Sequence, residues 1–425
     1  MFLLLCNYAM LRIMSFLRSI KNIFMKKPGS GKRVFVGVSG GVDSSVAAAI
    51  LIERGYEVTG VFIRTWTPEW LPCTWRAERR DAIRVCAHLG IPFVELDLSA
   101  EYKQGVADYM ISEYARGRTP NPDVMCNREV KFGGFLDWAL HHGADYIATG
   151  HYARVIDDYR IHEHASDFFS DQLTKENFWR IPFLFIKKII SHVHGHQSRK
   201  SDDVNVQLKK GIDPGKDQSY FLWTLTQQQL KHTLFPIGHL PKSDVRKLAK
   251  KYNLPTAVKK DSQGICFIGM VDMKEFLKHY IEVASGDVLD TGDRVIGYHE
   301  GAVLYTLGER HGFTITEKGT GDRPYYVIAK DFTNNTITVI QDPAHTITEQ
   351  KKSYILENTI WRTVPTTGKS YTAHVRYHGE DKEVNIIATD HIYTAEFTEP
   401  DYTVAPGQSI VVYDGDVCMG GGIVK

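Results

Sequence analysis

The stretch Ser39-Gly40-Gly41-Val42-Asp43-Ser44-Ser45 joins an apolar run at residues 34–38 to a helix-like segment at 46–53. A strand, a glycine-rich turn and a helix start in this order can hold phosphate with backbone groups. The glycines let the chain approach an anion closely, and the first N–H groups of the helix point at it from the positive end of the helix dipole. The stretch therefore predicts a nucleotide-binding loop.

The composition is typical of a soluble enzyme with more than one domain. The chain has 425 residues, which predicts two or three domains, and its hydrophobic content of 43% is sufficient to fold them. Lys and Arg number 51 and Asp and Glu 50, so the formal net charge is +1. A nucleic-acid surface would have to be a local basic patch, because the total charge neither supports nor excludes RNA.

Alternating strand and helix patterns follow the loop. Amphipathic spacing in the last of the predicted helices is typical of one buried face. Strands that alternate with helices predict an α/β fold with a parallel, doubly wound sheet and a ligand at its carboxyl edge, where the stretch 39–45 would lie. The predicted strands cover 34–38, 60–63, 92–96 and 144–149, and the predicted helices cover 76–89, 102–116 and 128–142.

Four units are predicted along the chain. Residues 1–24 are interpreted as a leader or upstream extension outside the fold. Their lack of acidic residues also fits a transit peptide or a membrane-surface helix, but the apolar run is too short to span a bilayer, so no membrane partner is expected. The catalytic domain is predicted at 25–272, a small central domain at 273–322 and a C-terminal β-barrel at 323–425.

An inserted surface segment is predicted within the first domain at about 155–210, where the alternation stops. His192, His194 and His196 in this segment are interpreted as part of a solvated loop, since no Cys or carboxylate cluster completes a metal site. The barrel is predicted from short strands separated by turn residues. These strands are 326–328, 336–340, 383–388, 392–397 and 409–413.

Six cysteines form no CxxC pair and no spacing typical of a disulfide framework or a zinc ribbon. We therefore expect a reducing compartment, the cytoplasm, and no metal ligands. The cysteines are Cys6, Cys73, Cys86, Cys126, Cys266 and Cys418.

Two of these cysteines lie in unusual settings. Cys126 is in a turn before the last predicted helix, and with Asn127 as the expected N-cap it would lie at the positive end of that helix. Arg128 and Lys131 would add to the preference for thiolate over thiol. Cys266 has glycines close to it on both sides, a setting that fits core packing as well as chemistry.

Several long motifs resemble known sequences. The stretch SGGVDSS is similar to the signature of the PP-loop family, ATP enzymes that adenylate a substrate oxygen and release pyrophosphate. The chain from about Lys32 to its end, apart from the inserted segment, resembles the bacterial tRNA 2-thiouridylase family. The motifs that carry this resemblance are TPNPDVMCNREVKFGGFLDWAL, GADYIATGHYARV, DPGKDQSYFLWTL, LFPIGHLPKSDVRKLAKKY and KKDSQGICFIG.

The resemblance implies ATP-dependent 2-thiolation of the wobble uridine of tRNA, with ATP and Mg²⁺ as cofactors. Cys126 would be the nucleophile and Cys266 the persulfide carrier, and a persulfide donor and a thiol reductant would be further partners. Carried over by position, the ATP phosphates would be held by Gly37, Val38, Ser39, Gly40, Gly41, Val42, Asp43 and Ser44, and the adenosine would contact Ile63 and Gly150. The target base would meet Asn121, Pro122 and Asp123. Further contacts with tRNA would come from Lys216, Asp217, Gln218, Arg376 and Tyr377.

Several roles have two interpretations. Asp123 fits a general acid or base and equally a turn residue. Asp43 fits a Mg²⁺ ligand or a helix cap. The persulfide sulfur could attack the uracil directly, or Cys126 could first release hydrosulfide. A basic stretch could follow RNA phosphates or form a solvated helix face. It contains Lys242, Arg246, Lys247, Lys250, Lys251, Lys259 and Lys260.

Three alternative functions remain at this point. Another PP-loop enzyme that adenylates a small molecule would not need both cysteines. Iron–sulfur-dependent thiolation is disfavoured, because Asp123 occupies the position that would complete a CxxC pair with Cys126. A non-catalytic RNA-binding module would not need an intact SGGVDSS stretch together with both thiols.

Overall fold

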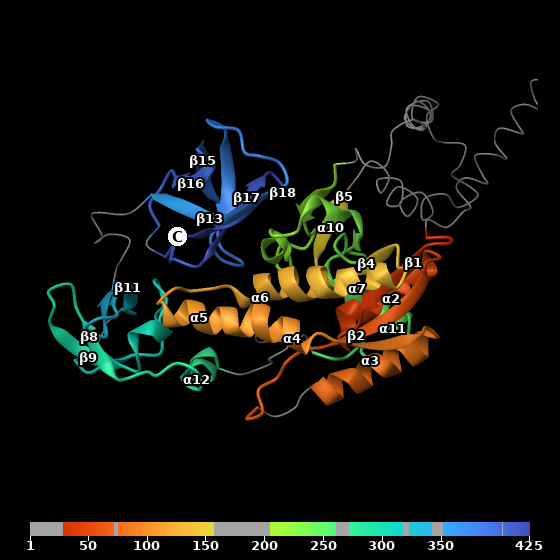
Figure 1. Ribbon diagram of the computed structural model, residues 1–425, viewed down its shortest axis with the longest axis horizontal. Coiled ribbons are helices and arrows are strands. Elements are labelled where there is room, and N and C mark those ends of the chain that lie inside the picture. Colours follow the sequence, from red (N-terminus) through yellow and green to blue (C-terminus); the bar gives the residue numbers. More distant parts are fainter. Residues whose placement is uncertain are drawn as a thin grey trace, which may run out of the picture.

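The computed structural model describes residues 29–71, 75–156, 205–260, 272–317, 323–341, 352–401 and 403–425. Three parts follow one another along the chain, as the colours in Figure 1 show. The predicted leader 1–24, the histidines at 192–196 and Cys266 lie outside the described residues. Within the described part, no helix is both long and apolar enough to cross a bilayer.

A parallel five-stranded sheet forms the core of the first part, with strand order β3-β2-β1-β4-β7. All neighbouring strands in it are parallel, and Val36 of β1 lies between Gly60 of β2 and Ala148 of β4. This confirms the predicted sheet and its central first strand. The strands are β1 (Arg33–Gly37), β2 (Glu57–Arg64), β3 (Phe93–Asp97), β4 (Tyr146–Ala148) and β7 (Thr233–Leu234).

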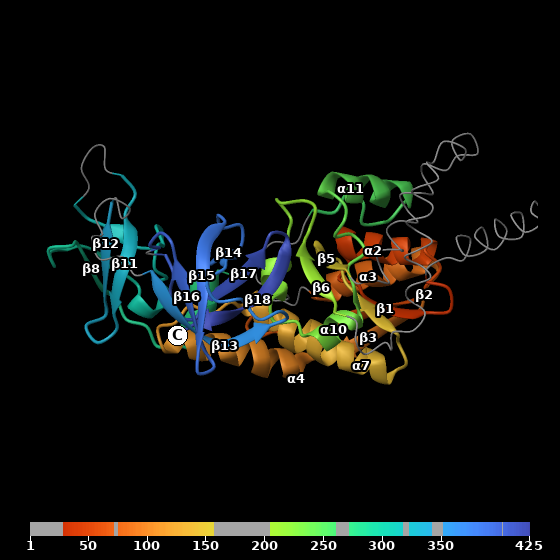
Figure 2. The ribbon, with the colours of Figure 1, turned by 90° about the horizontal axis from the view of Figure 1, so that it is seen from above.

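Helices cover both faces of this sheet. Figure 2 shows α2 (Val42–Glu53), α3 (Trp75–Leu89) and α11 (Lys242–Lys251) on one face and the run from α4 to α7 on the other. Nine of the residues of α2 are buried, so this helix is apolar on nearly every side. Gly60 lets α3 approach β2, because a Cβ at this position would lie 2.4 Å from the sulfur of Cys86.

Two long helical runs form the second face, and each contains a wider π-helical segment. The first consists of α4 (Ser99–Tyr102), η1 (Lys103–Asp108) and α5 (Tyr109–Ala115). The second consists of α6 (Pro122–Met125), η2 (Cys126–Gly134) and α7 (Phe135–His141). This second run begins at Pro122, six residues before the predicted start at 128.

The predicted insertion at 155–210 begins and ends within an antiparallel pair of strands. These strands are β5 (Ala153–Ile156) and β6 (Gln207–Lys210), with Val155 opposite Leu208. Residues 157–204, between them, lie outside the described residues. The chain then forms η5 (Ser219–Leu222) and α10 (Gln227–Lys231), which starts with a capping box between Thr226 and Gln229.

A second sheet forms the middle part, in the order β10-β9-β8-β12-β11. The sequence pattern assigns two of these strands, β11 and β12, to the C-terminal barrel, so the boundary predicted between residues 322 and 323 was wrong. β12 pairs in parallel with β8, a contact that a pattern of short strands does not reveal. The elements are α12 (Met273–Lys278), β8 (Gly286–Leu289), β9 (Val295–His299), η6 (Ala302–Leu304), β10 (Thr314–Ile315), β11 (Tyr326–Asp331) and β12 (Thr336–Ile340).

The C-terminal part is a closed barrel, as predicted. The strands follow the order β13-β16-β15-β14-β17-β18, and β18 pairs back to β13. Gly421 lets β18 approach β17 closely, because a Cβ at this position would lie 2.3 Å from the carbonyl oxygen of Ile410. The strands are β13 (Ser353–Trp361), β14 (Ser370–His374), β15 (Lys382–Thr389), β16 (Ile392–Phe397), β17 (Ser409–Asp414) and β18 (Val417–Val424).

The barrel and the middle part meet the first part beside the segment that joins α5 to α6. The Thr119 N–H donates to the carbonyl oxygen of Pro406 (2.8 Å), and Arg118 donates to the carbonyl oxygen of Val424 (3.3 Å) and pairs with Glu113 and Glu357. The Lys330 ammonium of the middle part donates to the carbonyl oxygen of Gly117 (3.0 Å), so the segment before α6 lies at a junction of all three parts.

Candidate active site

The stretch 39–45 forms a tight loop between the carboxyl end of β1 and the start of α2. Gly40 has φ +70°, and a Cβ at this position would lie 2.6 Å from the carbonyl oxygen of Glu78, so only glycine fits. The N-cap of α2 is Gly41, which has no side chain to cap the helix. The first N–H groups of α2 therefore face the loop without a capping side chain, as an anion site requires.

The other residues expected around the nucleotide meet at the same sheet edge. Gly37 ends β1, Ile63 is buried near the end of β2, and Gly150 follows β4. A Cβ at Gly150 would lie 2.7 Å from the backbone nitrogen of Ser44, so glycine is needed for the loop to approach β4. The structure thus brings together the residues that the sequence predicts to bind the nucleotide, and their binding role stays a prediction.

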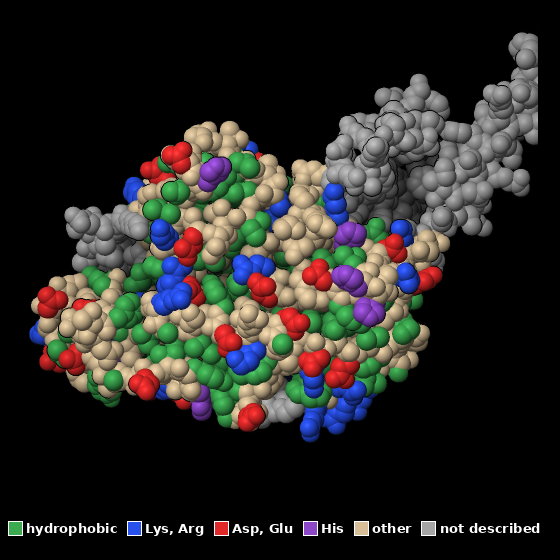
Figure 3. Space-filling view, in the orientation of Figure 1, with side chains coloured by type: hydrophobic (Ala, Val, Ile, Leu, Met, Phe, Trp, Pro, Cys, Tyr) green, Lys and Arg blue, Asp and Glu red, His purple; other side chains and the backbone are tan. Residues whose placement is uncertain are grey.

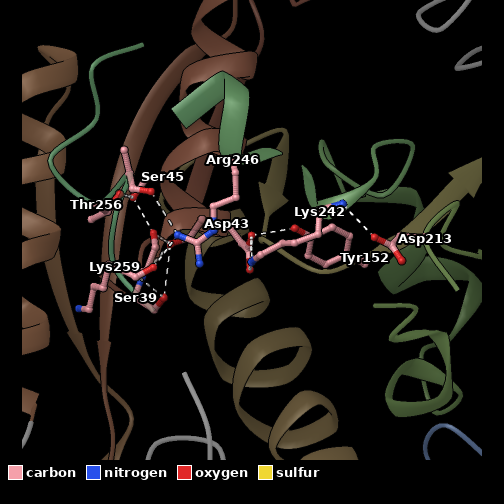
Figure 4. Close-up of polar contacts among 12 residues, drawn as sticks. Ser39, Asp43, Ser45, Tyr152, Asp213, Lys242, Arg246, Thr256 and Lys259 are labelled. Atoms are coloured by element: carbon pink, nitrogen blue, oxygen red, sulfur yellow. Dashed lines mark hydrogen bonds and ion pairs between the residues drawn. The ribbon is translucent and has the colours of Figure 1, made fainter. Parts of the chain in front are cut away.

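Asp43 does not cap α2, which corrects one of its two predicted interpretations. Its carboxylate accepts a hydrogen bond from the Tyr152 hydroxyl (2.8 Å) and forms an ion pair with the Lys242 ammonium (2.8 and 2.9 Å to its two oxygens). Figure 4 shows these three side chains next to one another, beside the loop. A lysine of α11 thereby places its charge beside the phosphate loop.

A second lysine approaches the loop from the other side. The Lys259 ammonium donates to the carbonyl oxygen of Gly40 (2.9 Å) and to the carboxylate of Asp81 (2.7 Å). Close to it, the Thr256 hydroxyl donates to the Ser45 hydroxyl (3.1 Å), so the segment after α11 packs against the loop (Figure 4). The loop therefore has ammonium groups on both sides.

The basic stretch at 242–260 thus divides into two groups. Lys242 and Lys259 contact the loop, and Arg246 donates to the carbonyl oxygen of Lys259 (2.5 Å). Lys247 is 77% exposed and pairs with Asp244 of its own helix, as expected for a solvated face. Another local concentration of Lys and Arg lies over α3 at the lower right of Figure 3, where the helix contains four arginines.

The helix that carries Cys126 is capped by Asn121, and the predicted cap Asn127 was wrong. The Asn121 side chain accepts from the backbone N–H of Val124 (3.1 Å), whereas Asn127 is buried and donates to the carbonyl oxygen of Phe221 (3.1 Å). Cys126 therefore lies beyond the first turn, where the influence of the helix dipole has fallen off. Its side chain is fully buried.

Asp123 lies in the first turn of α6. The Asn121 side chain accepts the hydrogen bond from the backbone N–H of Val124 that caps this turn, and both interpretations of Asp123 stay predictions. Its carboxylate lies near Tyr377 of the barrel: burial raises the pKa of Tyr377, and the negative charges of Asp217 and Asp123 raise this pKa further. Asp123, Asp217 and Tyr377 thus lie near one another, although they are far apart in the sequence.

Aromatic rings line this meeting place. The rings of Phe221 and Tyr377 are 4.5 Å apart, those of Tyr377 and His378 are 4.0 Å apart, and Tyr377 is 37% exposed. Both ring pairs are tilted, and exposed aromatic rings such as Tyr377 can hold a nucleobase that has left its own stack. Phe221 and His378 carry no pattern that would have identified them in the sequence.

Three side chains that were expected to contact tRNA also have partners within the protein. Asp217 accepts from the backbone N–H groups of Gly211 (2.8 Å) and Ser219 (3.1 Å). Gln218 accepts from the backbone N–H of Tyr152 (3.0 Å). Arg376 donates to the carbonyl oxygens of Leu307 (2.7 Å) and Thr403 (3.0 Å), and so joins the barrel to the middle part. These groups shape the site, and their contact with tRNA stays a prediction.

A doubly wound sheet with a phosphate loop at its carboxyl edge, followed by a closed barrel, defines a PP-loop nucleotide-binding protein. Family descriptions match the three parts in turn: "tRNA methyl transferase HUP domain" at residues 32–174 and 186–270, "tRNA methyl transferase PRC-barrel domain" at 274–341, and "Aminomethyltransferase beta-barrel domain" at 345–424. The second match includes β11 and β12, in agreement with the boundary seen in the structure.

Relatives match nearly the whole chain. The tRNA-specific 2-thiouridylase MnmA of Pseudomonas fluorescens SBW25 is 40% identical over 400 residues, which cover 93% of this chain and 95% of the relative. The MnmA of Pseudomonas aeruginosa UCBPP-PA14 is also 40% identical over 400 residues, with 93% and 94% covered. The chain belongs to the family of tRNA-specific 2-thiouridylases, which confirms the predicted resemblance.

Proposed function

We propose that this protein is a tRNA-uridine 2-sulfurtransferase that thiolates the wobble uridine in an ATP-dependent reaction. The observation that carries the proposal is the nucleotide loop flanked by Lys242 and Lys259, in a chain of the tRNA-specific 2-thiouridylase family. The proposed reaction needs reduced thiols, which favours a reducing compartment, and we assign the protein to the cytoplasm. Among the described cysteines, Cys86, Cys126 and Cys418, none forms a disulfide.

The proposed first step is adenylation of the substrate. The 2-carbonyl oxygen of uracil attacks the α-phosphorus of ATP, the bond to the β-phosphate oxygen breaks, and pyrophosphate leaves with the electron pair. Backbone N–H groups of residues 37–44 and the ammonium groups of Lys242 and Lys259 oppose the negative charge that develops on pyrophosphate. A poor leaving group is thereby converted into AMP.

Mg²⁺ would supply further positive charge at the phosphates. Among the described residues no group of three or more His, Cys, Asp or Glu side chains could hold a metal ion. Mg²⁺ commonly keeps several waters and takes one or two carboxylates beside substrate phosphates, and Asp43 at the loop fits this requirement. Asp43 would contact the Mg²⁺ shell through a water, which leaves its ion pair with Lys242 closed.

The target base is proposed to enter beside Asn121, Pro122 and Asp123. A base that leaves the anticodon stack needs an aromatic surface, and the rings of Phe221 and Tyr377 offer one. Asp123, whose charge raises the pKa of nearby Tyr377, is the proposed group that moves a proton at the base. Lys216, Asp217, Gln218 and Arg376 are the proposed neighbours of the tRNA backbone.

The proposed second step transfers sulfur. The terminal sulfur of a Cys266 persulfide attacks C2 of the activated uracil, and AMP leaves. The Cys126 thiolate then attacks the inner sulfur of Cys266, which breaks the S–S bond, leaves sulfur on C2 and forms a Cys126–Cys266 disulfide. A thiol reductant returns both cysteines to the reduced form, and a donor protein restores the persulfide. Earlier release of hydrosulfide by Cys126 gives the same products.

Cys126 must become accessible for this step, because its side chain is fully buried. It belongs to a hydrophobic cluster with Met125, Val130 and Ile63. Local movement of the helix around residue 126 is therefore part of the proposed cycle.

Mass spectrometry of tRNA nucleosides tests the proposal. Thiolation-deficient tRNA is incubated with the full chain, ATP, Mg²⁺ and a persulfide donor, and we expect 2-thiouridine that depends on ATP. Absence of 2-thiouridine with a folded protein would reject the assignment, and incorporation without ATP would reject the adenylation step.

A further inference from the structure

The loop at 211–218 is fastened to the carboxylate of Asp43 by two separate routes. This loop contains Lys216, Asp217 and Gln218, the proposed tRNA neighbours, whereas Asp43 lies in the first turn of the helix that starts at the nucleotide loop.

The first route runs through Tyr152. The Gln218 side chain accepts from the backbone N–H of Tyr152 (3.0 Å), and the Gln218 N–H donates to the carbonyl oxygen of Tyr152 (2.9 Å). The Tyr152 hydroxyl in turn donates to Asp43 (2.8 Å). Because Tyr152 is almost fully buried, a shift of Gln218 moves the hydroxyl with it.

The second route runs through Lys242. Its backbone N–H donates to the carboxylate of Asp213 in the loop (2.9 Å), and its ammonium binds both oxygens of Asp43. The ammonium also lies 5.6 Å from the centre of the Tyr152 ring, so the two routes touch each other (Figure 4). A displacement of the loop would change both bonds to Asp43 together.

We propose that Tyr152 is a positioning residue that couples tRNA binding at the 211–218 loop to nucleotide binding at the phosphate loop. The inference rests on the proposed function. tRNA that engages the loop fixes Tyr152 and Lys242 on Asp43, which holds the first turn of α2 and the lysine charge in the geometry that binds phosphate. Coupling of this kind is reciprocal and commonly amounts to roughly 5-fold to 150-fold in affinity.

The test is the dissociation constant of α,β-methylene-ATP, measured on the full chain with and without an unmodified tRNA transcript that has a wobble uridine. We expect tRNA to tighten binding of the analogue by at least about 5-fold in the wild type. Tyr152→Phe keeps the ring and removes only the hydroxyl, and it should reduce this ratio to less than about 2-fold. The analogue should change the affinity for tRNA by the same factor in each protein.

Tyr354→Phe is the matched control, because the buried Tyr354 hydroxyl donates to the carbonyl oxygen of Asp401 (2.8 Å) within the barrel. It should keep the wild-type ratio. Asp213→Ala, which cuts the second route, should lower the ratio as well and replaces Tyr152→Phe if that variant does not fold.

Two results would overturn the coupling: a ratio near one in the wild type, or a wild-type ratio in folded Tyr152→Phe. Nucleoside analysis of the wild type separates this failure from failure of the proposed function. 2-Thiouridine formed without coupling rejects the inference alone, whereas coupling without 2-thiouridine rejects the sulfurtransferase assignment alone.

Discussion

The nucleotide loop and the helix around Cys126 are built in opposite ways. The loop depends on backbone geometry and on ion pairs that lie at the open carboxyl edge of the sheet, with Lys242 and Lys259 on either side. Cys126 is fully buried in a hydrophobic cluster. In the proposed reaction, phosphate chemistry would take place at a preformed, charged edge, whereas the thiol would be shielded until it reacts.

The largest expected effect comes from breaking the loop. Gly40→Ala places a Cβ 2.6 Å from the Glu78 carbonyl oxygen at φ +70°, so the loop must shift. A misplacement of about 1 Å can cost about 100-fold. We expect Gly40→Ala to lose about 100-fold in affinity for α,β-methylene-ATP, measured by calorimetry. Gly31→Ala is the control: it has φ +78° with nothing within 4 Å, and it should bind the analogue normally. Equal loss in both variants would contradict a specific role for the loop.

Shielding of Cys126 can be measured directly. Iodoacetamide should modify Cys126 more than about 100-fold more slowly in the native protein than in urea, because the thiol reacts only after local opening. Peptide mass spectrometry follows the rate. Rapid modification in the native state would show that the two regions are equally open.

The lysines at the loop give the next effect. Lys259→Met removes a charged hydrogen-bond donor, and we expect pyrophosphate release to fall by roughly 10-fold to 100-fold. Lys247→Met on the solvated face of α11 should stay within about 2-fold. Similar losses in both variants would mean that the lysines act through the overall positive charge of this surface and not through contact with the loop.

The smallest effect concerns stability, away from both regions. Burial lowers the pKa of Lys330 to about 8, and Glu309 opposes this shift. Between pH 8 and 10.5 the unfolded chain holds a proton on this lysine that the folded chain has lost, so its contribution to stability rises with pH. From pH 8 to pH 10 the wild type should gain roughly 2 kcal/mol relative to Lys330→Met in urea unfolding. No relative gain would mean that Lys330 is not desolvated.

The sequence predicts the loop well and the thiol site less well, for physical reasons. The loop is one continuous stretch whose glycines and helix start determine its form, so pattern alone located Gly40 and Asp43. The partners of Asp43 come from remote segments: Lys242 is 199 residues away, and only folding brings it to the loop. The start of the Cys126 helix was misplaced because Asn121 and Asn127 are both good N-caps, and burial of Asn127 against Phe221 decides between them.

The barrel boundary illustrates a similar limit. Strands β11 and β12 have the same short, turn-bounded pattern as the barrel strands, and the parallel pairing of β12 with β8 assigns them to the middle sheet. Which strands pair with each other depends on the tertiary structure, so the strand propensity of a segment does not determine its partner.

The most direct test measures pyrophosphate and 2-thiouridine in one incubation of Cys126→Ala with tRNA, ATP, Mg²⁺ and a persulfide donor. The equally buried Cys86→Ala is the control. We predict that Cys126→Ala still releases pyrophosphate in a tRNA-dependent manner but forms no 2-thiouridine, while Cys86→Ala does both. Full 2-thiouridine formation by Cys126→Ala, or loss of both activities in the folded variant, would contradict the division of work between the charged loop and the buried thiol.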